Sequence, residues 1–465
     1  MENDKDDEEI ERLLTESNSR FIEEDLINFL KIPSNTLNKR GIEQTIEYII
    51  KYLSPFCQKI EEIEGKINPL VLAKIEGQSR TPLLIYMMYD TQPVNDASKW
   101  ISNPFAAELR YLPEPLNVLG KCIISRGAYN SKTPLICFLN VIKILQEYEK
   151  LPISLILIFD GEEEVGSPTL INHLKTNKEV FKNCVSAYYP AAKQDLEGKA
   201  VLKLGYKGIL SINIKLFSDN EETHSAYSSF IPNPAVELVS LINLIYSENK
   251  FNVPSLKNKY RLNNQEEMMI ETLGNQLDIN KIKMKAGIIQ TLKENARQAF
   301  TDLLFEPTFN ISTLKSGYLG EGIKNIVPNN AECNIDIRVA HKVSLIKIYN
   351  EIKNIVEKFA ENSKLEIKLT KNISYEGSRV GLNSKLIQSL VRSFEKLKVE
   401  PEVWPLSAAA APLSEIQKEL GLDFITGGLG VGGYAHSPNE FIQVDSILNM
   451  RLSYYYFLNY YTKSF

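Results

Sequence analysis

Histidine and cysteine, the side chains that most often bind transition metals, are scarce in this chain. Its 465 residues include four histidines and five cysteines, and none of the cysteines stands in CxxC spacing. An odd, dispersed set of cysteines is typical of reduced thiols, so we expect a cytoplasmic protein.

The sequence also lacks long apolar runs and an excess of positive charge. No apolar run reaches the roughly 20 residues of a membrane-spanning helix, and the first residues lack the apolar core of a signal peptide. The net charge of −5 and the pI near 5.7 disfavour nucleic acid as a partner. The composition, 43% hydrophobic and 24% charged, is that of a soluble chain long enough for two domains.

One stretch, Ser154–Ser167, joins a buried strand to a cluster of carboxylates. Its first half is an unbroken apolar run, typical of a strand covered on both faces in a parallel sheet, and this run ends at Asp160. Glu162, Glu163 and Glu164 follow at the carboxyl end of the strand, where sites form in open α/β sheets. Adjacent carboxylates repel one another unless a cation or a shared proton compensates. Taken alone, the stretch is equally compatible with a solvated acidic loop.

The order of the predicted elements indicates an α/β domain interrupted by a second domain. Buried strands alternate with helices at both ends of the chain, which predicts a doubly wound, mostly parallel sheet. In the middle, strands with apolar residues at alternate positions predict an antiparallel sheet with one wet face. We therefore expect an α/β domain from 1–208 and 373–465, an inserted α+β domain from 209–372, and a site in the cleft between them. Residues 1–18 are expected to form a frayed helix or tail.

Two of the four histidines are candidates for a chemical role. His436 follows a glycine-rich loop and precedes Ser-Pro, so a ligand or an acid is favoured over a structural histidine. His224 lies in a loop of the predicted inserted domain. His173 and His341 are expected at the surface.

Motifs spread over nearly the whole chain resemble the M20 family of metallopeptidases and deacylases, and most closely its dipeptidase branch. In chain order they are Tyr89-Asp-Thr-Gln-Pro-Val94, Trp100 with Pro104-Phe105, Arg126-Gly-Ala128 with Lys132, Gly161-Glu-Glu-Glu-Val-Gly-Ser167, His224-Ser225, Asn325-Ile-Val-Pro328 with Arg338, and His436-Ser-Pro-Asn-Glu440. The resemblance implies a zinc-exopeptidase-like fold, two zinc ions bridged by a carboxylate and a hydroxide, and a glutamate as general base. It also implies a lid domain that dimerises and sends a histidine into the partner's site.

Several motif positions keep the residue that the family uses. By position, Glu163 corresponds to the general base and Asp90 to the carboxylate that orients a ligand. Glu164 and His436 correspond to ligands of one metal ion. The substrate-binding positions that the resemblance implies are His224, Arg338 and Asn325.

Other positions depart from the family in ways that weaken a metal site. Met88 stands in place of a histidine ligand, Ala192 in place of an aspartate ligand, and Asn130 in place of the bridging aspartate, where it is at best a weak ligand. The run Ala408–Ala411 replaces a Gly-Gly-Ser turn that binds the substrate carboxylate. Two dications about 4 Å apart repel by roughly 17 kcal/mol at an effective dielectric near 20, and carboxylates supply much of the compensation. We therefore expect no dinuclear centre, and at most one weakly held zinc ion or none.

Two classes of function follow from these substitutions. The first is a non-catalytic M20 homologue with an impaired site, acting as a peptide-binding or anion-binding protein or as a regulatory subunit. The alternative is an active metal-dependent peptidase or N-acyl amino acid amidohydrolase, with a single metal ion and Glu163 as general base. A third possibility is a stable dimer whose role lies on its surface.

The expected partners follow from the same resemblance. We expect a homodimer through the lid domain, or a mixed dimer with an active paralogue. A peptide or a carboxylate is the expected ligand, and neither nucleic acid nor a membrane is expected.

Overall fold

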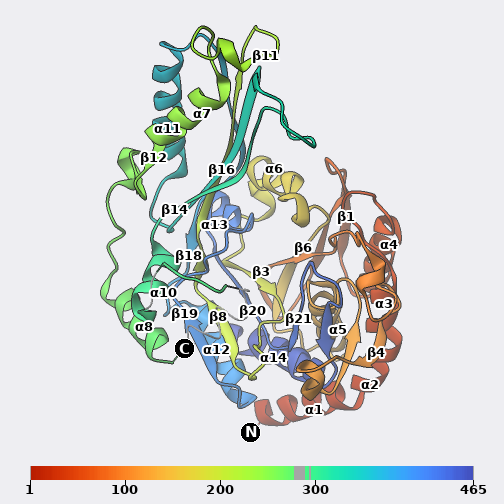
Figure 1. The fold of residues 1–465 in the computed structure, drawn as a ribbon. Helices are drawn as coiled ribbons and strands as arrows, with labels where there is room; N and C mark the ends of the chain where they lie inside the picture. Colours follow the sequence, from red (N-terminus) through yellow and green to blue (C-terminus); the bar gives the residue numbers. More distant parts are fainter. Residues whose placement is uncertain (1, 277–287, 293–294, 464–465) are drawn as a thin grey trace. The chain divides into compact units, whose positions relative to one another are not determined.

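The computed structural model describes residues 2–276, 288–292 and 295–463, and Figure 1 shows the fold. The chain divides into two compact units, each made of separate stretches. Unit 1 comprises Met1–Leu204, Val380–Trp404 and Glu415–Phe465, and unit 2 comprises Gly205–Arg379 and Pro405–Ser414. The stretch Pro405–Ser414, which the sequence prediction leaves in the α/β domain, thus belongs to unit 2. Within the described ranges, no helix is long and apolar enough to cross a bilayer.

A six-stranded sheet of order β1-β2-β6-β3-β7-β20 forms the centre of unit 1. Its strands span Lys59–Ile63 (β1), Leu70–Ile75 (β2), Ser79–Met88 (β3), Ile153–Asp160 (β6), Ser186–Pro190 (β7) and Asp423–Gly427 (β20). Strands β6, β3, β7 and β20 run parallel to one another, whereas β1 and β2 are antiparallel to their neighbours. This mostly parallel sheet in a mixed α/β unit confirms the predicted fold class. The apolar runs identified in the sequence are the buried central strands.

Helices cover this central sheet. Helix α5 (Lys132–Glu147) packs on β3 and β7, and α14 (Ser446–Thr462) packs on α5 and on α12 (Lys385–Lys396). The other helices of the unit are α1 (Glu2–Glu16), α2 (Asn18–Phe21), α3 (Ile27–Lys31), α4 (Ile42–Leu53), α6 (Pro168–Thr176) and α13 (Ser414–Leu420). Two smaller sheets complete it, one of order β21-β22-β5-β4 (Gly432–Gly433, Phe441–Gln443, Lys121–Ile124, Glu108–Tyr111) and one pairing β19 (Pro401–Trp404) with β8 (Ala200–Lys203).

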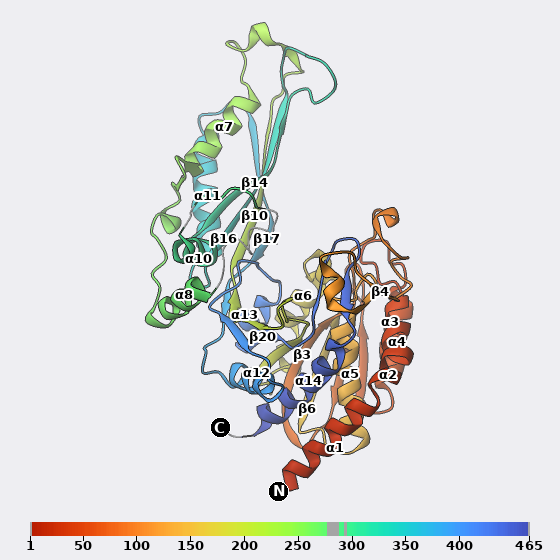
Figure 2. The ribbon, with the colours of Figure 1, turned by 60° about the horizontal axis from the view of Figure 1, so that its bottom comes forward.

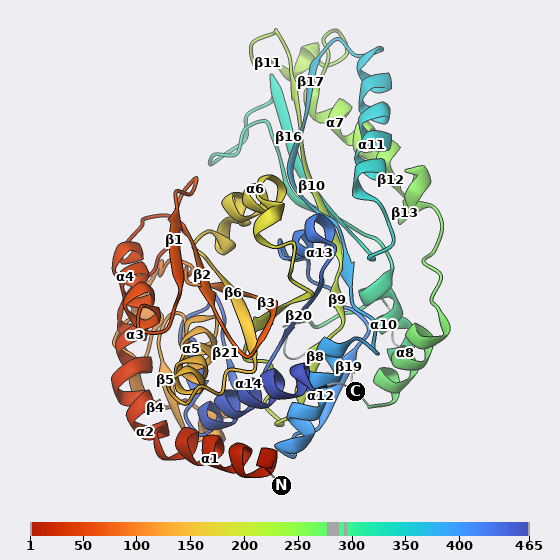
Figure 3. The same ribbon diagram turned by 180° about the vertical axis from the view of Figure 1, so that it is seen from behind.

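The acidic N-terminal segment is docked rather than frayed. Helix α1 runs beside α14, as Figures 1 and 3 show. The Arg451 guanidinium donates to the Leu14 carbonyl oxygen at 2.7 Å, and the Tyr455 hydroxyl donates to the Asp7 carboxylate at 2.6 Å. The expectation of a frayed tail was therefore wrong, because α14 supplies a cation and hydroxyls for this acidic helix.

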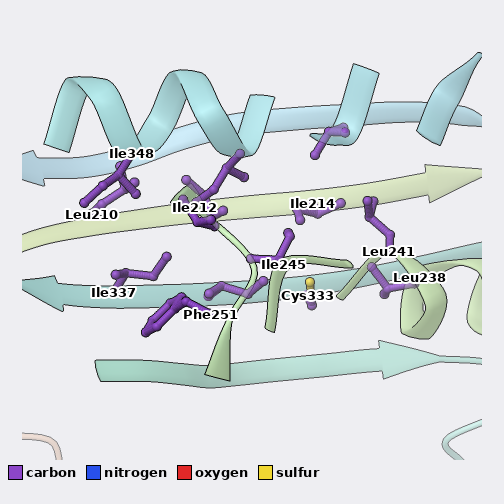
Figure 4. Packing of buried hydrophobic residues seen from close by; sticks show 14 of the residues in the cluster. Leu210, Ile212, Ile214, Leu238, Leu241, Ile245, Phe251, Cys333, Ile337 and Ile348 are labelled. Atoms are coloured by element: carbon purple, nitrogen blue, oxygen red, sulfur yellow. The ribbon is translucent and has the colours of Figure 1, made fainter. Parts of the chain in front are cut away.

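Unit 2 is built on a four-stranded antiparallel sheet of order β14-β16-β10-β17. The strands are Thr308–Ser316 (β14), Asn330–Val339 (β16), Gly208–Phe217 (β10) and Glu366–Tyr375 (β17). Helices α7 (Pro234–Ile245) and α11 (Leu345–Ala360) cover one face of this sheet, as Figure 2 shows. The alternating apolar residues of β10 and β16 point to those helices and form the core drawn in Figure 4, which includes Leu210, Ile212, Ile214, Leu238, Leu241, Ile245, Cys333, Ile337 and Ile348.

The edge strand β14 was not predicted from the sequence. Its side chains are mostly exposed and polar, so it carries no clear alternation. The rest of the unit includes α8 (Asn264–Gln276), α10 (Ala296–Phe305) and the short pairs β11–β15 (Thr223–His224, Ile326–Val327), β12–β13 (Tyr246–Ser247, Lys250–Phe251) and β9–β18 (Gly205–Tyr206, Ser378–Arg379). Part of the predicted polar helical segment 250–305 lies outside the described residues.

Candidate functional site

The three consecutive glutamates begin two residues after β6, at the carboxyl end of the parallel strands. The first of them, Glu162, holds the backbone in place. The Glu162 side chain is fully buried. Its Oε1 accepts hydrogen bonds from the backbone N–H groups of Ile67 (2.6 Å) and Asn68 (3.1 Å), and its Oε2 accepts from the N–H of Thr169 (2.9 Å). A carboxylate held by three backbone donors fixes the loop before β2 and the start of α6. Glu162 therefore anchors the turn that carries the next two glutamates.

Asp90 holds the same turn from the end of β3. Its fully buried carboxylate accepts hydrogen bonds from the N–H groups of Glu163 (3.3 Å) and Glu164 (3.1 Å), and from the Thr36 hydroxyl (2.9 Å). These bonds satisfy the first N–H groups of the 3₁₀ turn Glu163–Val165. In this chain Asp90 thus orients the backbone of Glu163 and Glu164. Position 88, two residues before it, carries methionine and so offers no imidazole for it to orient.

Three residues predicted as metal ligands converge on one point. His436 Nε2 lies 3.1 Å from Glu164 Oε1, and Asn130 Nδ2 lies 3.1 Å from His436 Nε2 and 3.3 Å from Glu164 Oε1. The other carboxylate oxygen of Glu164 accepts a hydrogen bond from Gln92 Nε2 at 2.7 Å. The Glu164 side chain is almost fully buried, whereas His436 is about half exposed. Both carboxylate oxygens of Glu164 thus have protein partners.

A second buried carboxylate positions Asn130. Glu440 accepts hydrogen bonds from the backbone N–H groups of Gly127 (3.1 Å), Tyr129 (3.0 Å) and Asn130 (2.7 Å). It also forms a buried ion pair with Arg126 at 2.7 Å. Removing either partner of such a pair leaves an uncompensated buried charge. Glu440 therefore shapes the loop that presents the Asn130 side chain to His436.

The electrostatics of the site show how crowded its carboxylates are. Burial, with Glu164 and Asp160 nearby, raises the pKa of Glu163 to about 8, while His436 and Lys193 act in the opposite direction. Burial raises the pKa of Asp90 well above its ordinary value. The hydrogen bond to Glu164 raises the pKa of His436, which favours the imidazolium form. Protein cations and retained protons compensate the negative charge of this cluster.

The positions of the missing ligands are buried and apolar. Met88 is the last residue of β3 and Ala192 follows β7, and their exposed fractions are 1% and 2%. The next residue, Lys193, is partly exposed, and it is the cation whose charge lowers the pKa of Glu163. A cation therefore follows the position where the family resemblance implies an anionic ligand.

The predicted substrate-binding residues lie in unit 2 and fall into two places. His224 pairs with Ile326 in the short β11–β15 ladder, and the Ser225 N–H donates to the Asn325 carbonyl oxygen at 3.1 Å. Asn325 precedes the start of β16, whereas Arg338 is the penultimate residue of that ten-residue strand. The structure thus brings His224 and Asn325 together and places Arg338 at the far end of the strand.

The alanine run packs around a buried lysine at the start of β10. The Lys207 N–H donates to the carbonyl oxygens of Ser407 and Ala409, and the Ala409 N–H donates to the Ser407 hydroxyl at 3.2 Å. The Lys207 ammonium donates to the Glu306 carbonyl oxygen at 2.6 Å, and burial lowers its pKa to about 8. The turn that replaces the Gly-Gly-Ser sequence is therefore ordered by backbone contacts.

Of the two remaining histidines, His173 is buried and His341 is partly buried, whereas both were expected at the surface. His173 is 9% exposed, on α6. The His341 side chain is 11% exposed and its Nε2 lies 3.7 Å from the buried Glu266 carboxylate, which also pairs with Arg379 at 3.1 Å. The expectation was wrong because polar neighbours in the sequence give no sign of this buried cluster in unit 2.

Three residues of the site, Glu162, Gln92 and Glu440, stand in the predicted motifs, but the sequence alone indicated no role for them. Gln92 and Glu440 stand inside quoted motifs, two residues from Asp90 and four residues from His436. Their contacts with Glu164 and with the loop of Asn130 depend on residues 72 and 310 positions away. A signal for Glu162 existed, since three like charges in a row favour stabilisation of at least one of them by hydrogen-bond donors.

Residues 84–460 match the sequence model of peptidase family M20/M25/M40. The chain belongs to this family. Among its M20 relatives, a Cys-Gly metallodipeptidase of Candida albicans is 22% identical over 455 residues, which cover 95% of this chain and 90% of that protein. A β-Ala-His dipeptidase of Rattus norvegicus is 23% identical over 279 residues, which cover 58% and 54% of the two chains.

A solved M20 structure shares the fold over nearly the whole chain. The M20 family metallo-carboxypeptidase from Sulfolobus solfataricus superposes with a TM-score of 0.83 at 28% identity, covering 94% of this chain and 98% of that one. The predicted family is thus confirmed, and so is the presence of dipeptidases among the relatives.

Three positions of this M20 chain carry side chains other than the metal ligands that the family resemblance implies. A thioether at position 88, an amide at 130 and a methyl group at 192 replace the expected imidazole and carboxylates. Across the described residues, no group of three or more His, Cys, Asp or Glu side chains is arranged to hold a metal ion. The donors that converge are one carboxylate, one imidazole and one amide, a set below the three strong ligands usual for catalytic zinc.

Proposed function

We propose that this chain is an M20 homologue with an impaired metal site that acts without catalysis, as a peptide-binding or anion-binding protein or as a regulatory subunit. The observation that carries the proposal is the state of Glu164. Its two oxygens already contact His436 (3.1 Å), Gln92 (2.7 Å) and Asn130 (3.3 Å). A metal ion would compete with these contacts, and two further positions where the resemblance implies ligands carry Met88 and Ala192.

Metal analysis and activity measurements test this proposal together. Protein purified without chelator is expected to hold at most one zinc ion per chain, weakly bound and removed by mild dialysis against chelator. Incubation with a panel of dipeptides and N-acyl amino acids, with zinc or manganese added, is expected to yield no hydrolysis above that of the Glu163→Gln variant. Two tightly bound zinc ions per chain, or hydrolysis that Glu163→Gln abolishes, would overturn the proposal.

A second candidate function is a single-metal peptidase or amidohydrolase with Glu163 as general base. Two observations favour it: Glu164, His436 and Asn130 converge on one point, and the raised pKa of Glu163, about 8, suits a group that exchanges protons near neutral pH. The dipeptidases among the relatives support the same reading. The hydrolysis assay distinguishes the candidates, because only this one predicts metal-dependent turnover that depends on Glu163.

The proposal extends to assembly. We propose a homodimer through the lid sheet of unit 2, or a mixed dimer with an active paralogue. His224 Nδ1 accepts a hydrogen bond from the Ala226 N–H at 3.1 Å, so the neutral ring carries its proton on Nε2. Because His224 is exposed, this Nε2–H is available as a donor to an anion on another chain. The cytoplasm stays the predicted location.

A further inference from the structure

A cavity of about 490 Å³ lies at the opposite end of the six-stranded sheet from Glu163. Its walls include residues at the starts of four neighbouring strands, namely Ile153 (β6), Ser79 (β3), Ser186 (β7) and Asp423 (β20). Since these strands run parallel, their starts share one edge, and the carboxylate cluster lies beyond the other edge. The cavity is thus separate from the candidate site. Its volume is in the range of small-molecule sites, roughly 300–1,000 Å³.

Two helix ends of opposite polarity line this cavity. Helix α12, 12 residues long, begins there after Ser384, and the 17-residue helix α14 ends there at Thr462. A helix start carries partial positive charge and a helix end partial negative charge. The Ser384 hydroxyl caps no N–H group of α12, and this fully enclosed oxygen has no hydrogen-bond partner within the described chain. Buried polar atoms normally have a partner, and rotation of the Ser384 side chain toward the cavity would let its hydroxyl gain one from a ligand.

Two side chains of opposite charge also line the cavity, and one of them, Asp423, shares a hydrogen bond with the Gln417 side chain. Asp423 and Lys385 both line it, and neither forms an ion pair with another described residue. The Lys385 ammonium lies 5.1 Å from the centre of the Tyr461 ring, and the Tyr461 hydroxyl shares a hydrogen bond with Ser186. Asp423 lines the same cavity as Tyr461. A positive and a negative group therefore line one cavity together with this tyrosine.

From this arrangement we infer that the cavity binds a free α-amino acid in its zwitterionic form. The ammonium group of the ligand pairs with Asp423 and the carbonyl end of α14. Its carboxylate pairs with Lys385, with the Ser384 hydroxyl and with the first N–H groups of α12. A ligand with only a negative charge would be repelled by Asp423. A ligand with only a positive charge would be repelled by Lys385. The inference does not rest on the proposed function of the Glu163 site.

Calorimetry with free amino acids tests the inference on the full chain. The probes are the free L-amino acids, each compared with its N-acetyl and its amide derivative, which lack one charge apiece. At least one free amino acid is expected to bind in the micromolar to low-millimolar range, and each derivative is expected to bind at least tenfold more weakly. Asp423→Asn and Lys385→Ala are each expected to weaken binding tenfold or more, about 1.4 kcal/mol.

Matched controls separate this site from the carboxylate cluster. Glu163→Gln and Lys182→Ala, at the candidate site and on the exposed surface respectively, are expected to leave the affinity unchanged. Lys385 is exposed, so its variant keeps the test valid even where Asp423→Asn fails to fold. The inference is overturned if no amino acid binds at ~10 mM, if the derivatives bind as well as the free amino acids, or if Glu163→Gln abolishes binding.

Discussion

Three adjacent glutamates in this chain have three different environments, and the difference arises from one turn. The Glu162 carboxylate accepts hydrogen bonds from three backbone N–H groups. The Glu164 carboxylate contacts the side chains of His436, Gln92 and Asn130. Glu163 lies between them without such partners, and its pKa rises to about 8 because burial and the neighbouring carboxylates disfavour its charge. The same residue type therefore serves as an anchor, as half of an ion pair and as a candidate base.

The first prediction, at the residue scale, is restoration of the metal site. Met88→His, Asn130→Asp and Ala192→Asp together are expected to raise zinc stoichiometry toward two per chain, as measured by elemental analysis after dialysis. Each single change is expected to do little, because the bridge and the terminal ligands of the second ion are needed at once. Hydrolysis is not expected to return with the metal, since Ala408–Ala411 lacks the serine hydroxyl and the glycine backbone freedom for a substrate carboxylate.

A matched variant tests the logic of the triple change. Met88→Leu with Asn130→Asp and Ala192→Asp keeps the new carboxylates without the imidazole, and it is expected to stay below two zinc ions. A fully loaded dinuclear site in Asn130→Asp alone would show that the ligand assignment is wrong.

At the scale of elements, helix α8 is tied to unit 2 by a buried polar cluster. Glu266 on α8 accepts hydrogen bonds from Tyr260 (3.2 Å) and Arg379 (3.1 Å), and His341 lies 3.7 Å away. Burial, with Arg379 nearby, lowers the pKa of His341 to about 4. The cluster therefore contains a histidine that is neutral in the folded state.

The second prediction is a loss of stability in mild acid. Between pH 6.5 and pH 4 the unfolded chain binds a proton at His341 that the folded chain does not, so stability falls as pH falls through this window. The expected loss is up to about 3 kcal/mol, from about 1.4 kcal/mol for each pH unit. Urea unfolding followed by circular dichroism at pH 7.5 and pH 4.5 measures it. His341→Phe is expected to flatten this dependence, whereas the exposed His224→Gln should leave it unchanged; equal slopes in all three proteins would refute the assignment.

The third prediction concerns how α14 holds the N-terminal helices. The fully buried Arg451 guanidinium donates to the Leu14 carbonyl oxygen (2.7 Å), the Asn140 amide oxygen (2.6 Å), Asn18 (3.0 Å) and the Ser17 hydroxyl (3.0 Å). Arg451→Met is expected to cost about 3–5 kcal/mol of stability, because several buried acceptors lose their donor. Urea unfolding measures the cost, and limited proteolysis is expected to cut first near α1. The exposed Arg12→Gln on α1 serves as control, and a loss below about 1 kcal/mol in Arg451→Met would contradict the role.

Most elements were predictable because their burial leaves a mark in the local sequence. Apolar runs identified β3, β6 and β7, and alternation identified β10 and β16. The edge strand β14 and the docked α1 were not predictable, because β14 is exposed and α1 depends on residues more than 400 positions away. The candidate site was predictable to the same extent. The motifs identified its residues, but contacts such as that of Glu440 with Asn130 join distant parts of the chain and cannot be read from the local sequence.

At the scale of the whole molecule, two of the predicted substrate-binding residues lie far apart within one chain. Arg338 and His224 belong to the same unit but lie at opposite ends of β16, so one ligand cannot use both from a single copy of that unit. At the lid tip near His224, Phe230 and Ile323 are 85% and 92% exposed. Large exposed apolar side chains that gather in a patch mark surfaces for association. These features favour assembly as the reason why the lid residues persist.

The last prediction is a dimer in which His224 acts on the other chain. Light scattering is expected to give the mass of a dimer, and spin labels are expected to place His224 closer to Glu163 of the partner subunit than to Glu163 of its own chain. A complementation assay measures dipeptidase activity after this protein is mixed with an active M20 dipeptidase whose own lid histidine has been replaced by alanine. Wild-type chain is expected to restore part of that activity and His224→Ala is not, because the exposed Nε2–H supplies the missing oxyanion donor. A monomer in solution, or a dimer whose His224 labels lie far from both Glu163 residues, would end the idea.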